Sequence, residues 1–499
     1  MYQSFIGLEV HIHLLTETKV FCGCRSAFGD EPNTNVCPVC MGYPGVLPSL
    51  NIEAMRMGCM VAKSLNCRIP ERTWFERKQY FYPDMPKNYQ ISQFASPLGQ
   101  AGYMMLEGRD HTSGKTIQKK VHIKECHLEE DAGKMIHTGT VSLLDYNRAG
   151  VSLLEIVTEP DMETGEEAEL FIQQLRRMVR YLHVCDGNME EGSLRADANV
   201  SINFPGKGLG KKVEIKNLNS SRFVRLALNY EIARQGEFLD AGKAVIQETR
   251  LWNENRDQTE PMRTKENAQD YRYFPEPDLP VFTPEPSFLA SVEAGLVELP
   301  LDRMKRLCSE YALGTEAADL ITEEKAEADY FEEAVALAVR QGLGKREAAQ
   351  RISNLLLQDI KHILLREGIP LSGLASFVLS PQHLADLAVM VCGGKVSLKN
   401  AKQALEISIS TGRPPDSIIR ERGWELIADE SAIAEAVKAV YAAEEKLFSE
   451  VRAARSGGNA KRGRTLAAFL VGKVLDATGG RADPKIAGKQ IEALIQMEA

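Results

Sequence analysis

The 499-residue chain lacks a long hydrophobic run, since no apolar stretch approaches the roughly 20 residues that a membrane-spanning helix needs. Its first residues lack the basic segment and apolar stretch that make up a signal peptide. We therefore expect a cytoplasmic protein with no membrane partner. The composition, 44% hydrophobic and 26% charged, is ordinary for globular domains, and the length predicts about three of them.

The chain also lacks an excess of positive charge, because it has 60 Lys and Arg and 69 Asp and Glu, which gives a formal net charge of −9. A nucleic-acid-binding surface would therefore have to be a local basic patch. The phosphate-binding-loop, dinucleotide-binding and protein-kinase motifs are all missing. The glycine-rich segment 206–212 is better explained as a hairpin turn. The sequence therefore contains no nucleotide-binding motif that would predict the use of ATP.

The first half of the chain alternates between strand-like and helix-like patterns. Strands are expected at 5–14, 121–128, 151–157, 194–203, 213–217 and 245–252. Helices are expected at 51–66, at 164–182 and from about residue 220. This half predicts an α+β fold with a largely antiparallel sheet. A proline-rich segment at 274–286 predicts a linker, and residues 294–499 read as short helices.

Carboxylates and imidazoles recur on the expected strands. On the first strand, Glu9 and His11 fall on the face opposite the apolar residues. Glu155 stands in the middle of an apolar strand, where an unpaired carboxylate is costly, and residues 129–131 are three adjacent acids. These groups predict one or two divalent cations, most simply Mg²⁺, and metal-assisted phosphoryl transfer. A solvated acidic surface is the alternative.

Four of the ten cysteines lie close together in the sequence, as a Cys-x-Cys pair followed by a Cys-x-x-Cys pair: Cys22, Cys24, Cys37 and Cys40. Four thiolates complete a tetrahedral structural zinc site and leave no open position for substrate. A redox Cys-x-x-Cys pair would explain only the second half of the cluster, and four unrelated cysteines are a further alternative. Structural zinc is therefore the preferred interpretation.

Two segments combine positive charge with features that suit phosphate. Segment 77–89 mixes Lys, Arg and aromatic residues with proline, which fits a surface loop or a platform for a phosphate and a base. The last helices, from residue 446, are rich in Lys and Arg around a flexible insert at 456–459. They predict either a solvated face or a contact with an RNA backbone.

Several motifs together resemble the B subunits of aspartyl/glutamyl-tRNA amidotransferases, and the resemblance runs along nearly the whole chain. The motifs are at 7–11, 80–84, 89–93, 129–134, 147–150, 155–161, 189–195 and 270–278. Segments 469–473 and 482–484 resemble the family's tail domain, which small YqeY-like proteins share. One departure is Val151-Ser152, where the family usually has Thr or Val before Pro. Some members lack the four cysteines.

The resemblance implies a cradle-like catalytic domain at 1–293 with a zinc-binding insertion at 22–40, a helical domain at 294–405 and a YqeY-like tail domain at 406–499 that binds tRNA. It implies a carbon–nitrogen ligase that uses ATP and Mg²⁺ to phosphorylate the side-chain carboxylate of Glu-tRNA(Gln), Asp-tRNA(Asn) or both. Ammonia released from glutamine by a partner then forms the amide. The implied partners in a heterotrimer are the A subunit, which is an amidase (glutaminase), and the small C subunit.

The resemblance also implies roles for particular residues. One Mg²⁺ would be held by His11, Glu130 and Glu155, and a second cation would be held or supported by Glu9, Glu129 and Asp197. These six residues form the expected catalytic set. We also expect contacts to phosphate or to the tRNA end from Lys78, Lys87, Arg148 and Lys216, and contacts to the tRNA body from Lys461, Arg462, Arg464 and Lys473. A non-catalytic zinc-bearing RNA-binding factor and a metal-dependent nuclease are the alternative functions.

Overall fold

The computed structural model describes residues 2–110, 113–264, 270–368, 379–426, 430–456 and 460–497. The chain divides into two compact units, residues 1–300 and 301–499. Among the described residues, all strands of the sheets lie in the first unit, and the second unit is helical. The expected α+β fold class is thereby confirmed.

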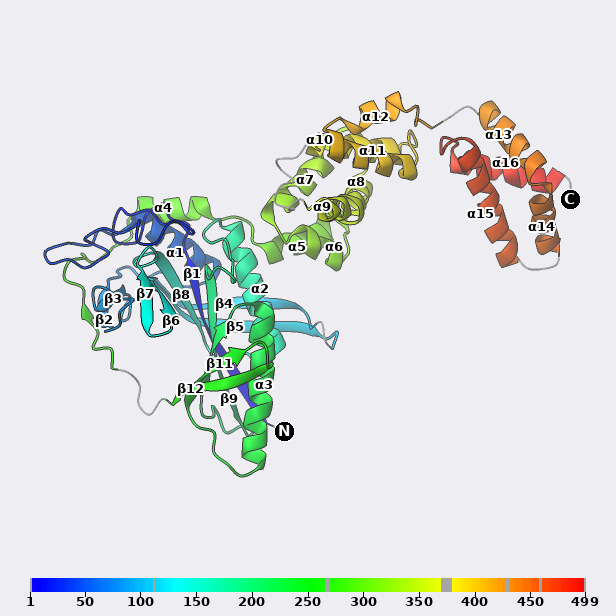
Figure 1. Cartoon of the computed structure of the whole chain (residues 1–499). Coiled ribbons are helices and arrows are strands. Elements are labelled where there is room, and N and C mark those ends of the chain that lie inside the picture. The colour runs from blue at the N-terminus through cyan, green and yellow to red at the C-terminus, as the bar shows by residue number, and fades with distance from the viewer. Residues whose placement is uncertain are drawn as a thin grey trace. The chain divides into compact units, whose positions relative to one another are not determined.

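An eight-stranded sheet forms the centre of the first unit (Figure 1), in the order β12-β11-β10-β9-β1-β8-β5-β4. Its strands are β1 (Gln3–His13), β4 (Gly99–Arg109), β5 (Thr116–Glu130), β8 (Ser152–Thr158), β9 (Leu194–Asn203), β10 (Val213–Leu218), β11 (Glu248–Asn253) and β12 (Gln258–Thr264). Neighbouring strands are antiparallel, apart from the parallel pair β10 and β11. The first strand of the chain therefore lies inside the sheet, between β8 and β9.

Three helices pack against one face of this sheet: α1 (Ile52–Ser64), α2 (Gly165–Tyr181) and α3 (Ser221–Asp240). Each begins after a residue whose side chain caps backbone N–H groups, namely Asn51, Thr164 and Ser220. The even-numbered apolar residues of β1 from 6 to 12 are buried in this layer. Because side chains alternate along a strand, the odd-numbered residues 9 and 11 point to the opposite face, away from the helices.

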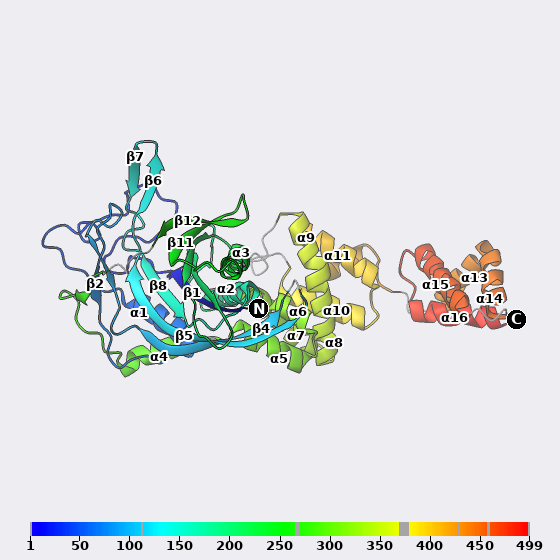
Figure 2. The ribbon, with the colours of Figure 1, turned by 90° about the horizontal axis from the view of Figure 1, so that it is seen from below.

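Two smaller sheets add to the first unit. One consists of β2 (Glu76–Gln79), β3 (Tyr89–Ser92) and β13 (Phe274–Pro275), and the other is a hairpin of β6 (Lys134–Thr138) and β7 (Val141–Asp145) that stands out from the unit in Figure 2. Arg77 on β2 donates two hydrogen bonds, of 2.6 and 2.8 Å, to the buried carboxylate of Glu276. The prediction of a linker at 274–286 is therefore wrong, because residues 274–275 pair with β2 and Phe282 pairs with Thr73 of the same unit.

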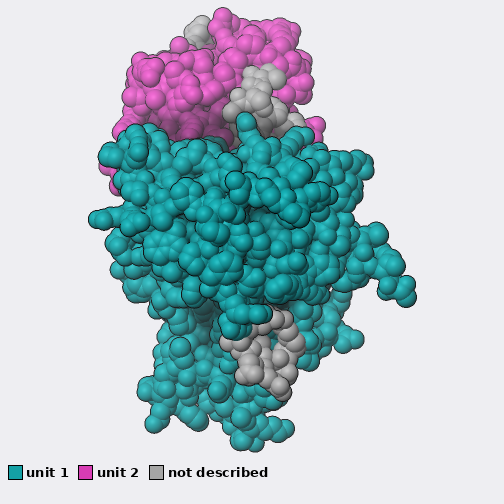
Figure 3. All heavy atoms as spheres, turned by 90° about the vertical axis from the view of Figure 1, so that its left-hand side faces the viewer, with its two compact units in different colours: residues 1–300 teal, residues 301–499 magenta. Residues whose placement is uncertain are grey.

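The second unit begins near α5, and Figure 3 distinguishes it from the first unit by colour. After α4 (Pro286–Gly295) of the first unit come α5 (Pro300–Tyr311), α6 (Thr315–Ile321), α7 (Lys325–Arg340), α8 (Lys345–Asn354), the π-helical turn η1 (Leu355–Ile360), α9 (Lys361–Arg366), α10 (Pro381–Cys392), α11 (Leu398–Thr411), α12 (Pro415–Glu421), α13 (Glu430–Ala443), α14 (Glu445–Ser456), α15 (Ala460–Ala477) and α16 (Pro484–Met497).

The buried apolar residues of the second unit form two clusters, one from Leu307 to Ile419 and one from Ile433 to Ile495. The first of these clusters ends at Ile419, so the boundary between the two clusters comes later in the chain than residue 406, where the tail domain is expected to start. The expected flexible insert lies outside the described residues, apart from Ser456. In the part of the chain that the structure describes, no helix has the length and apolarity that crossing a membrane requires.

Candidate catalytic pocket and metal sites

A cavity of about 410 Å³ opens on the face of the main sheet that points away from the helices. Strands β1, β5, β9 and β10 contribute residues to it, and so does the β2 region. Its charged lining residues are His11, Lys78, Glu129, Asp131, Arg195, Asp197 and Lys216. Acids that can hold a divalent cation and cations that can hold phosphate oxygens thus share one cavity.

The first acidic cluster joins three adjacent strands. On β1, His11 lies opposite Glu155 of β8. Its Nε2 is 3.4 Å from Oε2 of Glu155 and 3.9 Å from Oε1 of Glu129 on β5. One ligand atom from each of these three residues lies within 4.8 Å of the others. An imidazole nitrogen with two carboxylates is a ligand set that divalent cations accept, so the three form a candidate metal site.

Glu130 lies apart from this cluster. Its carboxylate accepts a hydrogen bond from Lys87 and one of 2.9 Å from the backbone N–H of Ile91. It lines a second cavity, of about 200 Å³, together with Cys22 and Cys40. Consecutive residues of a strand point to opposite faces, so Glu129 and Glu130 do not both point toward His11. The structure therefore differs from the expected trio of His11, Glu130 and Glu155, because Glu129 takes the place of Glu130.

His127 belongs to the same cluster and was missed by the sequence analysis. Its Nε2 lies 3.0 Å from Oε2 of Glu155 and 3.8 Å from Oε2 of Glu129. Its Nδ1 is buried and has no hydrogen-bond partner among the described residues. The signal that could have found it is the alternation along β5, which places His127 on the same face as Glu129 two residues later.

The ionisation states of the residues in the first acidic cluster depend on one another. Burial lowers the pKa of His11, but the carboxylates of Glu155 and Glu129 outweigh burial and raise this pKa to about 9. Burial likewise opposes ionisation of Glu155, but His127 and His11 hold the pKa of Glu155 well below its usual range. In the absence of a metal ion, Glu155 is therefore ionised and balanced by protonated imidazoles, and a divalent cation would displace protons when it binds.

Lys78 faces this cluster from β2. Burial disfavours its charged form, but the carboxylate of Glu129 and then that of Glu155 outweigh burial, so the pKa of Lys78 is raised. Its Nζ also lies 5.1 Å from the centre of the Tyr271 ring. The ammonium group is therefore charged at neutral pH and held in the pocket.

A second acidic cluster lies beside the first, on β1, β9 and β10. Glu9 lies opposite Asp197, and Glu214 completes a group whose ligand atoms lie within 4.8 Å of one another. The ammonium of Lys216 contacts Asp197 and lies 3.2 Å from Glu214. The expected group of Glu9, Glu129 and Asp197 is thus only partly brought together, because Glu214 takes the place of Glu129. Lys216 already balances part of this negative charge.

The four cations expected to contact phosphate occupy different places. Lys78 and Lys216 line the main cavity, whereas Lys87 lines the second cavity and pairs with Glu130. Arg148 donates from Nε to the carbonyl of Ala132 at 3.0 Å and from Nη2 to that of Gly133 at 2.8 Å. Of these four, Lys78 and Lys216 are therefore the ones placed for a phosphate in the main cavity.

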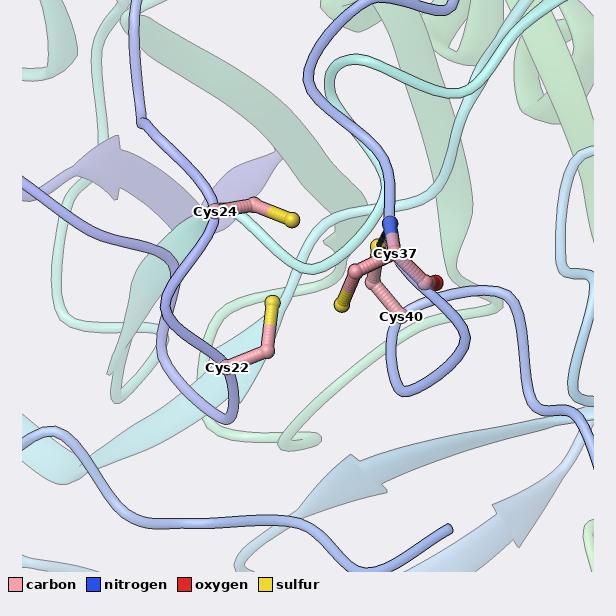
Figure 4. A group of neighbouring side chains, drawn as sticks. All are labelled: Cys22, Cys24, Cys37 and Cys40. Atoms are coloured by element: carbon pink, nitrogen blue, oxygen red, sulfur yellow. Dashed lines mark hydrogen bonds between the residues drawn. The ribbon is translucent and has the colours of Figure 1, made fainter.

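The four clustered cysteines meet in space, and their sulfur atoms point toward one another in Figure 4. All four sulfur atoms lie within 4.8 Å of one another, and none of these cysteines forms a disulfide. Four thiolates around zinc lie about 3.8 Å apart when each Zn–S distance is about 2.3 Å, so these residues fit the ion. The hydrogen bond from Cys22 and the nearby Lys19 ammonium lower the pKa of the Cys40 thiol to about 4, whereas the pKa of Cys22 is raised by its hydrogen bond to Cys40 and that of Cys24 by burial, so the thiolate character lies on Cys40. Thiolate character of this kind favours metal binding.

The four basic residues expected to bind the tRNA body lie on α15 of the second unit. Lys461, Arg462 and Arg464 are exposed. Lys473 forms an ion pair of 2.9 Å with Glu444 and lies 5.5 Å from the centre of the Phe469 ring. Three cations thus face solvent on one helix, which suits contact with a polyanion.

Comparison with known proteins finds two family matches. Residues 4–290 match the family described as GatB/GatE catalytic domain, and residues 329–495 match the family described as GatB domain. Three relatives are each named as the B subunit of aspartyl/glutamyl-tRNA(Asn/Gln) amidotransferase. The one from Thermodesulfovibrio yellowstonii is 43% identical and covers 99% of both chains. The one from Acaryochloris marina is 42% identical over 98% of this chain and 97% of its own. The one from a Thermoanaerobacter species is 43% identical over 97% of each.

Proposed function

Since the chain belongs to the family of aspartyl/glutamyl-tRNA(Asn/Gln) amidotransferase B subunits, we propose that it amidates mischarged tRNA in the cytoplasm. The substrates are Glu-tRNA(Gln), Asp-tRNA(Asn) or both, and the enzyme is a carbon–nitrogen ligase with glutamine as amido donor. The observation that carries the proposal is the relationship along the full length of the chain. The main cavity supports it, because acids and cations suited to ATP and a divalent cation line the same space.

The reaction has two steps. A side-chain carboxylate oxygen of the aminoacyl group attacks the γ-phosphorus of ATP, so that an acyl phosphate forms and ADP leaves with the electron pair of the broken bond. Ammonia then attacks the acyl carbon, the bond to phosphate breaks, and a proton leaves the new amide nitrogen. Both reactants of the first step are anions, and Lys78 and Lys216 lower their repulsion from within the cavity.

The acidic residues divide between two roles in this proposal. Mg²⁺ bound by His11, Glu129 and Glu155 would neutralise charge on the phosphate oxygens. The second acidic cluster, with Lys216 between Asp197 and Glu214, would hold or support a second cation. Glu130 would act indirectly, because its carboxylate holds Lys87 and the backbone of β3 at Ile91 beside the second cavity.

We further propose a structural Zn²⁺ on the four clustered cysteines and tRNA-body contacts from α15. The proposed partners in a heterotrimer are a glutaminase, as the A subunit, and a small C subunit. The proposed domains are a cradle at 1–293, a helical domain at 294–405 and a YqeY-like tail at 406–499. The separate apolar cluster of α13 to α16 supports an independent tail, although by this criterion the tail begins after α12. The exposed cations of α15 support tRNA binding there.

The test is an assay of the chain assembled with its amidase and small partner subunits. Glu-tRNA(Gln) and Asp-tRNA(Asn) are each supplied with ATP, Mg²⁺ and glutamine, and both γ-phosphate release and the amide product are measured. We expect phosphate release that depends on the mischarged tRNA, followed by amide formation. Cleavage of the tRNA without ATP would favour the metal-dependent nuclease instead. Tight tRNA binding without either reaction would favour the non-catalytic RNA-binding factor.

A further inference from the structure

Asp131 gathers three cationic or titratable side chains at the edge of the main cavity. One oxygen of its buried carboxylate lies 2.7 Å from Nε2 of His13, 2.8 Å from Nη2 of Arg195 and 3.4 Å from Nε of Arg148. One carboxylate thus faces two permanently charged guanidinium groups at this edge of the cavity.

The two arginines use their donors differently. Arg148 donates to two backbone carbonyls besides approaching Asp131, so its role is to hold the chain around residues 132–133. Among the described residues, the hydrogen bond of the Arg195 side chain is the one to Asp131, and its Nε is buried without an acceptor. A guanidinium carries five N–H donors. Arg195 therefore commits one donor to a carboxylate and keeps others available for an anion, whereas Arg148 commits two donors to the backbone.

Arg195 is also placed beside the first acidic cluster. On β9 it lies directly opposite His11 of β1, and it lines the same cavity as Glu129 and Lys78. Its side chain is 36% exposed, so a ligand in the cavity can reach it. The ion pair with Asp131 restricts the rotation of the guanidinium, which lowers the entropy lost when it binds a further group.

We propose that Arg195 is a catalytic residue that binds oxygens of the phosphoryl group transferred from ATP, and that Asp131 positions it. This inference rests on the proposed function. A guanidinium fork matches two phosphate oxygens, and cations placed on a transferring phosphoryl group stabilise the charge of the transition state. Lys78 and Lys216 supply single-point contacts in the same cavity, so Arg195 is the group there that can bind in a bidentate manner.

The experiment uses the assembled complex with Arg195→Ala and Arg195→Lys. We measure γ-phosphate release with Glu-tRNA(Gln) at varied ATP and tRNA, Mn²⁺ binding, glutamine hydrolysis by the partner and the unfolding temperature. For Arg195→Ala we expect kcat to fall about 100- to 1,000-fold, the usual effect of removing one donor to transition-state charge. Mn²⁺ binding and glutamine hydrolysis should stay at the wild-type level. Arg195→Lys should recover part of kcat, because it keeps the charge but not the fork.

Arg148→Ala is the matched control, since it removes the other arginine that approaches Asp131. We expect it to lower the unfolding temperature more than Arg195→Ala does, because it also removes two hydrogen bonds to backbone carbonyls. Replacement of Arg148 by Lys should not recover kcat in the way that Arg195→Lys does. Comparison of the Arg195 and Arg148 variants shows whether a fall in kcat comes from a lost contact with the phosphoryl group or from a loss of local structure.

Three results would overturn the inference. One is a wild-type kcat in Arg195→Ala. Another is a loss of Mn²⁺ binding in Arg195→Ala as complete as that in Glu129→Gln, which would make Arg195 a structural residue of the acidic cluster. The third is an effect confined to the KM for the aminoacyl-tRNA, which would assign Arg195 to the substrate carboxylate or tRNA end. Absence of tRNA-dependent phosphate release in the wild-type complex would instead contradict the proposed function, and this inference with it.

Discussion

The ionised state of the Glu155 side chain depends on its neighbours on adjacent strands of the sheet. It stands in an apolar strand, and an isolated carboxylate there would be expensive to bury. Two imidazoles lie within 3.4 Å of its carboxylate, those of His11 and His127. They stabilise the ionised form and leave a compact group of nitrogen and oxygen ligands. The same arrangement that makes the buried charge tolerable also makes it a candidate metal site.

We expect Glu155→Gln to fold nearly normally and to lose metal-dependent chemistry. The amide keeps the shape of the side chain but not its charge, so the ion would no longer be held in place. Phosphate release from ATP with Glu-tRNA should fall by about two to three orders of magnitude, the usual loss when charge stabilisation of this kind is removed. The partner's basal glutamine hydrolysis should persist. Phosphate release at the wild-type level would show that Glu155 is a buried structural acid.

Glu130→Gln is the comparison for this variant, because Glu130 lies next to Glu129 in sequence but outside the first acidic cluster. It should keep Mn²⁺ binding, measured by titration, while its unfolding temperature falls because Lys87 loses its buried partner. Loss of Mn²⁺ binding in this variant would instead support the trio of His11, Glu130 and Glu155.

At the scale of elements, the cysteine-bearing loops join parts of the first unit that are far apart in sequence. Lys19 is fully buried and donates to the carbonyls of Asn35 at 2.7 Å and of Tyr146 at 3.3 Å, and to the sulfur of Cys40 at 3.7 Å. The loop around residue 33 is in turn hydrogen-bonded to the end of β7. Zinc on the four thiolates would therefore stabilise contacts between the insertion and the β6–β7 hairpin.

We expect about one zinc per chain in metal analysis of the purified protein, and less in Cys37→Ser. The variant should also unfold at a lower temperature, because the binding free energy of a structural metal contributes directly to folding. Cys308→Ser, in the helical unit, is the control and should leave the zinc content unchanged. A zinc-free preparation that is fully folded would contradict the assignment.

The helices α5 and α7 of the second unit are joined by ion pairs that make their stability depend on pH. Arg303, which is buried, lies 2.5 Å from Glu332, and Arg306 lies 2.6 Å from it. Burial raises the pKa of Glu332, but Arg306 and Arg303 outweigh this and lower it. A depressed carboxyl pKa means that the pairs stabilise the fold above the unfolded-state pKa of about 4.5 and lose this effect as pH falls through the folded-state value.

Glu332→Gln should therefore destabilise the chain by about 1–3 kcal/mol at pH 7, a value reduced from that of a fully buried pair because Glu332 is partly exposed. The difference from wild type should shrink as pH falls below about 4.5, where the carboxyl of the unfolded chain takes up a proton, and should disappear only below the lowered folded-state pKa of Glu332. Hydrogen exchange of α5 and α7 in the full chain, at pH 7 and at pH 4, measures it. The neighbouring exposed Glu333, changed to Gln, is the control. An equal difference at both pH values would refute the role of the ion pairs.

At the scale of the whole molecule, the candidate metal-binding acids and the cations expected to bind tRNA lie in different parts of the chain. The net charge of −9 disfavours general binding to nucleic acid, and the cations expected to bind tRNA are concentrated on α15. The acidic clusters lie on a sheet of the first unit, where each is partly balanced by imidazole or ammonium groups. The proposed tRNA binding and the proposed chemistry thus rest on separate parts of the chain, so we expect that one can be changed without the other.

Ending the chain after Ser456 should weaken tRNA binding and flatten its dependence on salt, because fewer phosphate contacts release fewer counterions. Removal of one phosphate contact should lower the slope of log K against log salt concentration by about 0.7–0.9. The full-length variant with Lys461, Arg462 and Arg464 changed to Gln tests the charges without removing α15 from the apolar cluster. Glutamine hydrolysis by the partner should be unchanged in both. An unaltered tRNA affinity would refute tRNA binding by this helix.

The sequence by itself determined those features that depend on residues close together in the chain. The alternation on β1 separated a core face from a polar face, the helix-like patterns at 51–66 and 164–182 located α1 and α2, and the cysteine spacing indicated one cluster. The same local patterns carried the family motifs, and the comparisons confirmed that relationship. These features follow from backbone periodicity and from side chains that act on their own neighbourhood.

The tertiary structure decided which distant residues meet. The choice of Glu129 over Glu130, and the entry of His127 and Glu214 into the acidic clusters, depend on the register of strands that are up to about 200 residues apart in sequence. Alternation along β5 shows that His127 and Glu129 share a face, but a shift of one residue in register would present the opposite face to His11, and no local pattern reveals that choice. The tertiary structure also distinguishes Arg148 from Arg195. Sequence patterns do not separate these two arginines, whereas the fold places different hydrogen-bond acceptors around each of them.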